Sequence, residues 1–147
     1  MNSILLDEIT LQGFNLIQAE YFSHQVGPIM TIRSSSLAFN TSAYKALENC
    51  EAVHIMINSV EKKIVVKPIN SEDKDAVKWI KDLNNPKSVP IECTALTRRL
   101  YEAWRWDEQL RYQAYGKQVM IGSKVALLFD FNRSKIYRGF KLVESGA

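Results

Sequence analysis

The chain has 147 residues, of which 46% are hydrophobic and 24% are charged, with six glycines and four prolines. This composition is that of one folded globular domain or of two very small lobes, and it excludes disordered and fibrous classes. The formal charge of +3 combines a net −3 in residues 1–75, with six basic and nine acidic residues, and a net +6 in residues 76–147, with thirteen basic and seven acidic residues. The basic second half permits binding to phosphate groups.

The sequence shows no segment that would place the chain in or across a membrane. The longest apolar run, Val125–Phe129, is far shorter than the roughly 20 residues of a spanning helix. Residues Met1–Thr10 have no basic stretch followed by a long apolar one, so no secretion signal is indicated. We therefore expect a cytoplasmic protein. Cys50 and Cys93 form no disulfide framework, and we expect free thiols.

Residues 1–29 predict an extended N-terminal segment, because aromatic and β-branched residues alternate there with polar ones. A turn at Gly27-Pro28 ends it. The pattern then predicts a strand over Ile29–Arg33, a turn of three serines and a second short strand over Leu37–Phe39.

A short helix and a hairpin are predicted next. Asn40 suits a helix N-cap, since its side-chain oxygen can accept a hydrogen bond from a first-turn amide. Residues 53–57 alternate between apolar and polar, which is the period of a strand with one buried face, and Ile64–Val66 provides a partner strand. We therefore expect residues 30–70 to form a first β-α-β-β unit.

Residues 71–88 are predicted to be a helix followed by a linker. Ser71 can cap a helix over 71–84 in which Ala76, Trp79, Ile80 and Leu83 share one face. The proline-containing stretch that follows, up to Pro90, is typical of a connection between two units.

The order of elements then repeats over residues 89–147. An extended piece over 89–93 precedes a longer helix, and strands over 111–119 and 124–130 form a second hairpin. A basic tail follows. We therefore expect an α+β, β-rich fold in which two β-α-β-β units form a swapped-hairpin-like or pseudo-symmetric small barrel.

Residues 37–68 resemble a known family. The runs Leu37–Leu47, Ala52–Ile57 and Lys63–Pro68 are similar to the half-unit of the AbrB/SpoVT/MazE swapped-hairpin family, the transition-state regulators. Two such units in one chain would be similar to the MraZ arrangement. The resemblance implies a small β-rich barrel that binds double-stranded DNA and regulates transcription. In the family the turn before the helix carries basic residues that meet DNA. Here that turn departs from the family pattern, since it reads Ser34-Ser35-Ser36 with only Arg33 beside it.

Basic residues of the second half are further candidates for phosphate contact. Arg98 and Arg105 lie on the polar side of the predicted helix with Arg99 beside them, and they could contact phosphate. The alternative is that Arg98 and Arg105 pair with Glu102 on a solvated face.

In the basic tail, Arg133, Lys135 and Arg138 alternate with aromatic residues, a mixture that can hold nucleic acid by charge and stacking. A charged edge strand would show the same pattern.

The tryptophan pair in Trp104-Arg105-Trp106 favours a second function. Trp106 is either a core residue or the anchor of a protein-interaction module, such as an inhibitor or accessory factor of a mobile element.

The Cys50–His54 pair lacks the second pair of a zinc site, and no catalytic constellation is evident. We therefore expect a DNA-binding regulator that forms a homodimer, has no enzymatic activity and uses no metal or cofactor.

Overall fold

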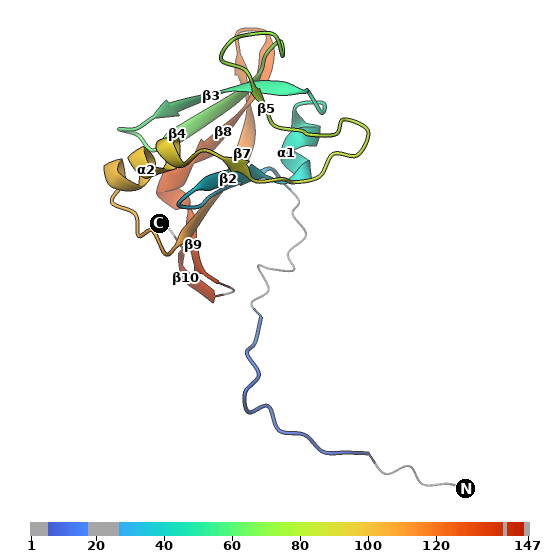
Figure 1. Ribbon diagram of the computed structural model, residues 1–147, viewed down its shortest axis with the longest axis vertical. Coiled ribbons are helices and arrows are strands. Elements are labelled where there is room, and N and C mark those ends of the chain that lie inside the picture. Colours follow the sequence, from blue (N-terminus) through green and yellow to red (C-terminus); the bar gives the residue numbers. More distant parts are fainter. Residues whose placement is uncertain (1–5, 18–26, 140, 146–147) are drawn as a thin grey trace, which may run out of the picture.

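The computed structural model describes residues 6–17, 27–139 and 141–145. Its ten strands form one curled antiparallel sheet, a half-barrel with the order β5-β3-β4-β8-β7-β1-β2-β6, and β9 joins it through β7 (Figure 1). This confirms a β-rich α+β fold. Within the described residues, none of the helices has the length and apolarity needed to cross a lipid bilayer.

The elements of the sheet and its helices have the following bounds. They are β1 (Ile29–Ile32), β2 (Ser36–Phe39), α1 (Thr41–Ala46), β3 (Ala52–Asn58), β4 (Lys63–Pro68), β5 (Val77–Lys78), β6 (Ile91–Glu92), α2 (Thr94–Ala103), β7 (Arg111–Ile121), β8 (Lys124–Asp130), the 3-10 helix η2 (Phe131–Arg133), β9 (Lys135–Arg138) and β10 (Lys141–Ser145). The two hairpins and the two helices that the sequence predicts within its β-α-β-β units are confirmed.

Strands β1 and β2 form a tight hairpin in which all eight residues are buried. The N–H of Arg33 donates to the carbonyl of Ser36 at 2.8 Å, which closes the turn around Ser34 and Ser35. β1 also pairs with β7, so the hairpin lies inside the sheet and not at its edge. This position explains why its strands are apolar on nearly every residue.

Asn40 caps α1 as predicted and also fixes the start of β1. Its side-chain oxygen accepts from the N–H of Ala43 at 3.0 Å and from the N–H of Ile29 at 2.9 Å. Its side-chain nitrogen donates to the carbonyl of Gly27 at 3.0 Å. One amide group therefore joins the helix to the strand eleven residues before it.

We expect Asn40→Ala to lower the free energy of unfolding by about 2 kcal/mol, at the upper end of the range for a lost helix cap, because the strand contacts are lost with it. Urea unfolding followed by circular dichroism measures this change. Asn40→Asp is the control, since it keeps both accepted bonds and loses only the donated one. An equal loss in both variants would contradict the capping role.

The prediction of a helix over residues 71–84 is wrong. These residues form turns and the two-residue strand β5, which pairs with β3. Trp79 and Ile80 are buried, whereas Leu83 is 49% exposed, so the segment does not present the helical face that the spacing suggested. Trp79 packs edge-on against Tyr44 and Phe39 and closes the core beneath α1.

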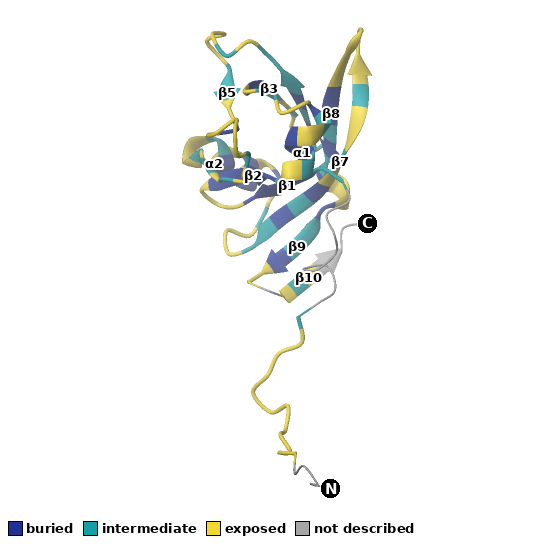
Figure 2. Ribbon diagram, turned by 90° about the vertical axis from the view of Figure 1, so that its right-hand side faces the viewer, coloured by how far each residue is buried: buried dark blue, intermediate teal, exposed yellow. Residues whose placement is uncertain are grey.

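Strands β4 and β8 join the two hairpins into one sheet. Val65 of β4 lies opposite Leu128 of β8, and Ile64 lies opposite Phe129. The β7–β8 hairpin extends beyond the body, and its turn contains Gly122 with a φ of 61°, a conformation that favours glycine (Figure 2). The buried side chains lie on the concave side of the sheet, so a single core serves both halves of the chain.

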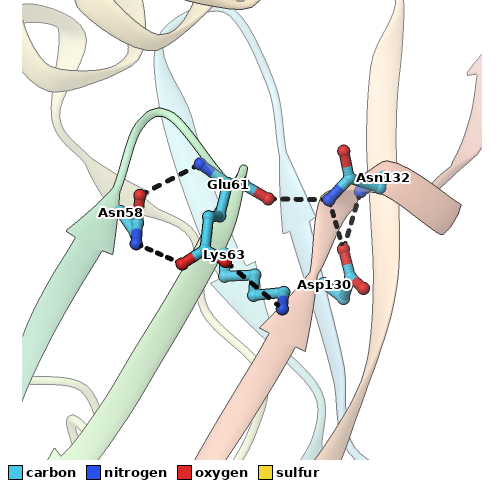
Figure 3. Close-up of polar contacts among 5 residues, drawn as sticks. All are labelled: Asn58, Glu61, Lys63, Asp130 and Asn132. Carbon is cyan, nitrogen blue, oxygen red and sulfur yellow. Dashed lines mark hydrogen bonds and ion pairs between the residues drawn. The ribbon is translucent and has the colours of Figure 1, made fainter.

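A polar network holds the β3–β4 turn to the end of β8 (Figure 3). Asn132 donates to the carbonyl of Glu61 at 2.6 Å and to the carboxylate of Asp130 at 2.8 Å. Asn58 in turn bonds both the N–H and the carboxylate of Glu61. Partial burial opposes ionisation of Asp130, but the hydrogen bonds from Asn132 and the nearby Lys63 hold its pKa below the ordinary value. The network connects residues from both halves of the chain.

The N-terminal extended segment falls only partly within the described residues. Residues 6–17 form no strand and contain one turn, in which the N–H of Phe14 donates to the carbonyl of Leu11 at 3.0 Å. Residues 1–5 and 18–26, which the prediction also covered, lie outside the described residues.

Candidate nucleic-acid interface

The face of β1, β7 and β9 that points away from the core carries polar and basic side chains. In register, Thr31 of β1 lies opposite Gln113 of β7, and Gln113 lies opposite Lys135 of β9. Because side chains alternate along a strand, Arg111 shares this face with Gln113, while Tyr112 between them is buried in the core. On this face the basic residues Arg111 and Lys135 therefore lie beside Gln113, while Thr31 is buried.

Arg33 and Arg111 line a hollow of about 190 Å³ at one end of this face. The hollow also includes Ser34, Glu108 and Tyr137. The guanidinium of Arg111 lies 4.8 Å from the centre of the Tyr137 ring, within the range of a cation–π contact. It also donates to the carbonyl of Gly139 at 2.5 Å, so its position is fixed from two sides.

Arg98 of α2 lines a second hollow, of about 210 Å³, together with the turn between β1 and β2. Ser34 and Glu108 line this hollow as well as the first, so the two adjoin. Thr97 holds α2 against the turn, because its hydroxyl donates to the carbonyl of Ser34 at 2.6 Å. The N–H of Cys93 donates to the carbonyl of Ser35 at 3.0 Å and completes this attachment.

Tyr101 supports the same region from beneath. Its hydroxyl lies 2.7 Å from the carbonyl oxygen of Leu110 and 3.2 Å from that of Ile32. Burial raises the pKa of Tyr101 above its ordinary value, so the hydroxyl stays protonated and can donate at neutral pH. The bond ties α2 to the strands that carry the basic face.

Arg138, at the end of β9, lies beside the first hollow and has acidic and polar neighbours. Its guanidinium is 3.8 Å from the carboxylate of Asp107 and donates to the side chain of Gln109 at 3.0 Å. We call Arg33, Arg98, Arg111 and Arg138 the arginine face. Glu108 and Asp107 are its acidic neighbours, and they moderate its charge.

The structure brings together only some of the residues that the sequence predicts to contact nucleic acid. Arg33 and Arg98 line the two adjoining hollows, and Arg138 bonds to Gln109 of the first hollow without lining it. Lys135 lies on the adjoining sheet surface, 5.6 Å from the centre of the Tyr115 ring. The other predicted positions line neither hollow. These are Arg99 on α2, Arg105 with a left-handed φ of 53° after it, and Arg133 in η2.

Trp106 lies in an aromatic cluster. Its ring stacks on Tyr112 at 3.8 Å between centroids with an interplanar angle of 7°, and it meets Trp104 and Tyr101 edge-on. Trp106 is half-buried and packs against the core, which agrees with the first of its two predicted roles, that of a core residue. Docking of a protein partner through Trp106 stays a prediction.

Arg111 and Gln113 are the site residues that sequence reasoning missed. The signal was present, since polar residues alternate with Tyr112 and Ala114 at the start of β7. Their relation to Arg33 depends on the pairing of β1 with β7, which joins opposite halves of the chain.

Cys50 and His54, the pair considered for a metal site, each contact other residues. His54 lies 2.9 Å from the carboxylate of Asp73, and the hydrogen bond from His54 lowers the pKa of Asp73. Cys50 and Cys93 are free thiols, and burial raises the pKa of both. In residues 6–17, 27–139 and 141–145 no three His, Cys, Asp or Glu side chains group as metal ligands would.

The fold and this surface define a β-rich half-barrel whose candidate site is an arginine-lined outer face. Comparison of the chain with protein-family models found no match, and neither did searches of curated proteins and of solved structures.

Proposed function

We propose that the protein is a non-enzymatic, DNA-binding transcription regulator that contacts the phosphate backbone through the arginine face. The observation that supports this most is that three arginines from separate parts of the chain line two adjoining hollows, with Arg138 beside the first. Arg33 and Arg98 reach adjoining hollows from the β1–β2 turn and from α2, and Arg111 and Arg138 come from β7 and β9.

The chemistry of these groups suits phosphate. A guanidinium presents a planar set of donors that can bond two phosphate oxygens at once, and it keeps its charge at all physiological pH values. Serine hydroxyls commonly add a further contact to a phosphate oxygen, and Ser34 and Ser35 lie between the arginines. Contacts of this kind fix the position of a protein on a duplex without reading its sequence.

The finer architecture belongs to the same proposal. The element order β2-α1-β3-β4 is followed by β6-α2-β7-β8, which supports two related β-α-β-β units in a pseudo-symmetric barrel. In this proposal the chain is an AbrB-like regulator with an MraZ-like duplication, and it works in the cytoplasm as a homodimer without a cofactor.

Fluorescence anisotropy with a labelled duplex of random sequence, measured from low to moderate salt, tests the proposal. We expect binding that weakens steeply with salt, because each phosphate contact contributes about 0.9 to the slope of log K against log salt. Arg33→Gln with Arg98→Gln should weaken binding and reduce the slope by about 1.8.

Arg99→Gln with Arg133→Gln is the matched control, since it removes the same charge from outside the arginine face. We expect it to leave most of the slope in place. The proposal fails if the wild-type protein does not bind duplex DNA at low salt. It also fails if the control variant loses as much of the slope as the face variant.

A further inference from the structure

The described part of the N-terminus carries an unusual number of exposed apolar side chains. In residues 6–17, which we call the N-terminal arm, five large apolar residues are between 71% and 93% exposed. They are Leu6, Ile9, Leu11, Phe14 and Leu16. Exposed large apolar side chains gathered in one segment are typical of a surface that binds another protein.

A groove of matching character lies at the other end of the molecule. It has a volume of about 540 Å³ and lies between the end of α1, the end of β4 and the β7–β8 hairpin. Its apolar lining comes from Ala46, Leu47, Pro68, Ile69 and Val125. The side chain of Gln118 donates to the carbonyl of Ala46 at 3.0 Å, so one wall is bonded to the other.

Met120 extends the apolar character of the groove toward the tip of the hairpin. It pairs in register with Val125 and is 62% exposed. Because directly paired residues of neighbouring strands share one face, Met120 lies on the same side of the hairpin as Val125.

The arm is acidic, and the groove offers it a basic residue on its hairpin wall. Residues 1–32 contain Asp7, Glu8 and Glu20 and have no Lys or Arg. Lys124 lines the groove, and Lys45 of α1 directly precedes Ala46 of its lining. Glu48 is the acidic residue of the groove lining.

The arm does not lie near the groove of its own chain. In both views it extends away from the body on the side opposite the β7–β8 hairpin (Figures 1 and 2). We infer that the arm of one copy docks in the groove of a second copy, and that this exchange is reciprocal. A reciprocal exchange of identical contacts closes a two-fold dimer. This inference is independent of DNA binding.

Sedimentation velocity over a range of concentrations tests the exchange with the full chain. We expect a wild-type dimer, and Phe14→Asp in the arm or Val125→Asp in the groove should each raise its dissociation constant at least about tenfold, since each places a charge in an apolar contact. Thr10→Asp in the arm and Val60→Asp on the β3–β4 turn are matched controls that should not change it.

Mixing the two variants gives the sharper result. A heterodimer of Phe14→Asp and Val125→Asp retains one intact arm and one intact groove that face each other, so the equimolar mixture should associate more tightly than either variant alone. Circular dichroism checks that each variant is folded, and Lys124→Glu replaces Val125→Asp if that variant unfolds. A monomeric wild-type protein, or a mixture no tighter than its parts, overturns the inference.

Disulfide formation distinguishes exchange from docking within one chain. We expect differently tagged Phe14→Cys and Val125→Cys chains to form a mixed disulfide dimer on mild oxidation, with wild-type protein as the control for Cys50 and Cys93. A chain that carries both Phe14→Cys and Val125→Cys tests the alternative. If only this double variant cross-links, and the disulfide forms within a single chain, the arm binds its own groove and the inference is overturned.

Discussion

Trp79→Ala is expected to lower the free energy of unfolding by about 3–5 kcal/mol, the range for removing a large aromatic from a core. The side chain is 1% exposed, and its ring centre lies 4.9 Å from that of Tyr44 and 5.1 Å from that of Phe39. The indole N–H donates to the carbonyl of Cys50 at 2.7 Å, and alanine would leave that carbonyl without this donor. Such a loss is a large part of the total stability of a domain.

Urea unfolding measures this loss, and Trp104 and Trp106 remain as fluorescent reporters in the variant. Leu83→Ala is the matched control, because the side chain is 49% exposed although it shares the apolar spacing of the same segment. We expect a change within about 0.5 kcal/mol for this variant. If Leu83→Ala destabilised the protein as much as Trp79→Ala, the helix indicated by the spacing would be favoured over the turns that the structure shows.

Gly116→Ala is expected to destabilise the protein by about 2 kcal/mol through overpacking. A Cβ atom at this position would lie 2.6 Å from Cε1 of Phe129, which is opposite Gly116 in the β7–β8 pairing. The Phe129 ring is fully buried and packs against Phe39, so it has little room to move away. The close approach of the ring to the backbone therefore requires glycine.

The double variant Gly116→Ala with Phe129→Leu checks this explanation. If the clash is with the ring, the two losses should not add, and a coupling of at least about 0.5 kcal/mol is expected from urea unfolding. Gly27→Ala is the control, because a Cβ there would meet nothing within 4 Å and its effect should stay within about 0.5 kcal/mol. Additive losses in the double variant would argue against the contact with Phe129.

The helix expected over residues 71–84 is a case in which the local sequence pattern predicts one structure and tertiary contacts produce another. Trp79 and Ile80 are apolar at helical spacing, and they are indeed buried. Yet two adjacent buried residues also fit a turn-rich segment laid across a core. The indole finds its hydrogen-bond partner in the carbonyl of Cys50, and β5 pairs with β3, so contacts distant in sequence outweigh the weak local preference.

The candidate site, too, could be predicted from the sequence only in part. The sequence indicates basic residues in the β1–β2 turn, along α2 and in the tail, but it does not show which of them meet. Arg33 and Arg98 lie around the same turn because Thr97 bonds Ser34, while Arg99 lies one position further along the same helix and lines neither hollow. A difference of one residue on a helix is a rotation of about 100°, which decides which side chain reaches the turn.

By itself, the sequence determined the strands β1 to β4, β7 and β8, including the hairpins β3–β4 and β7–β8, and the capped helix α1. Each of these depends on alternation, turn residues or a cap within a few positions of the chain. It also determined that positive charge gathers in the second half. Only the tertiary structure decided how the hairpins join through β4 and β8, where Trp79 lies, and that Arg33 faces Arg111 across paired strands. These features depend on contacts between residues far apart in the chain, which a local pattern does not specify.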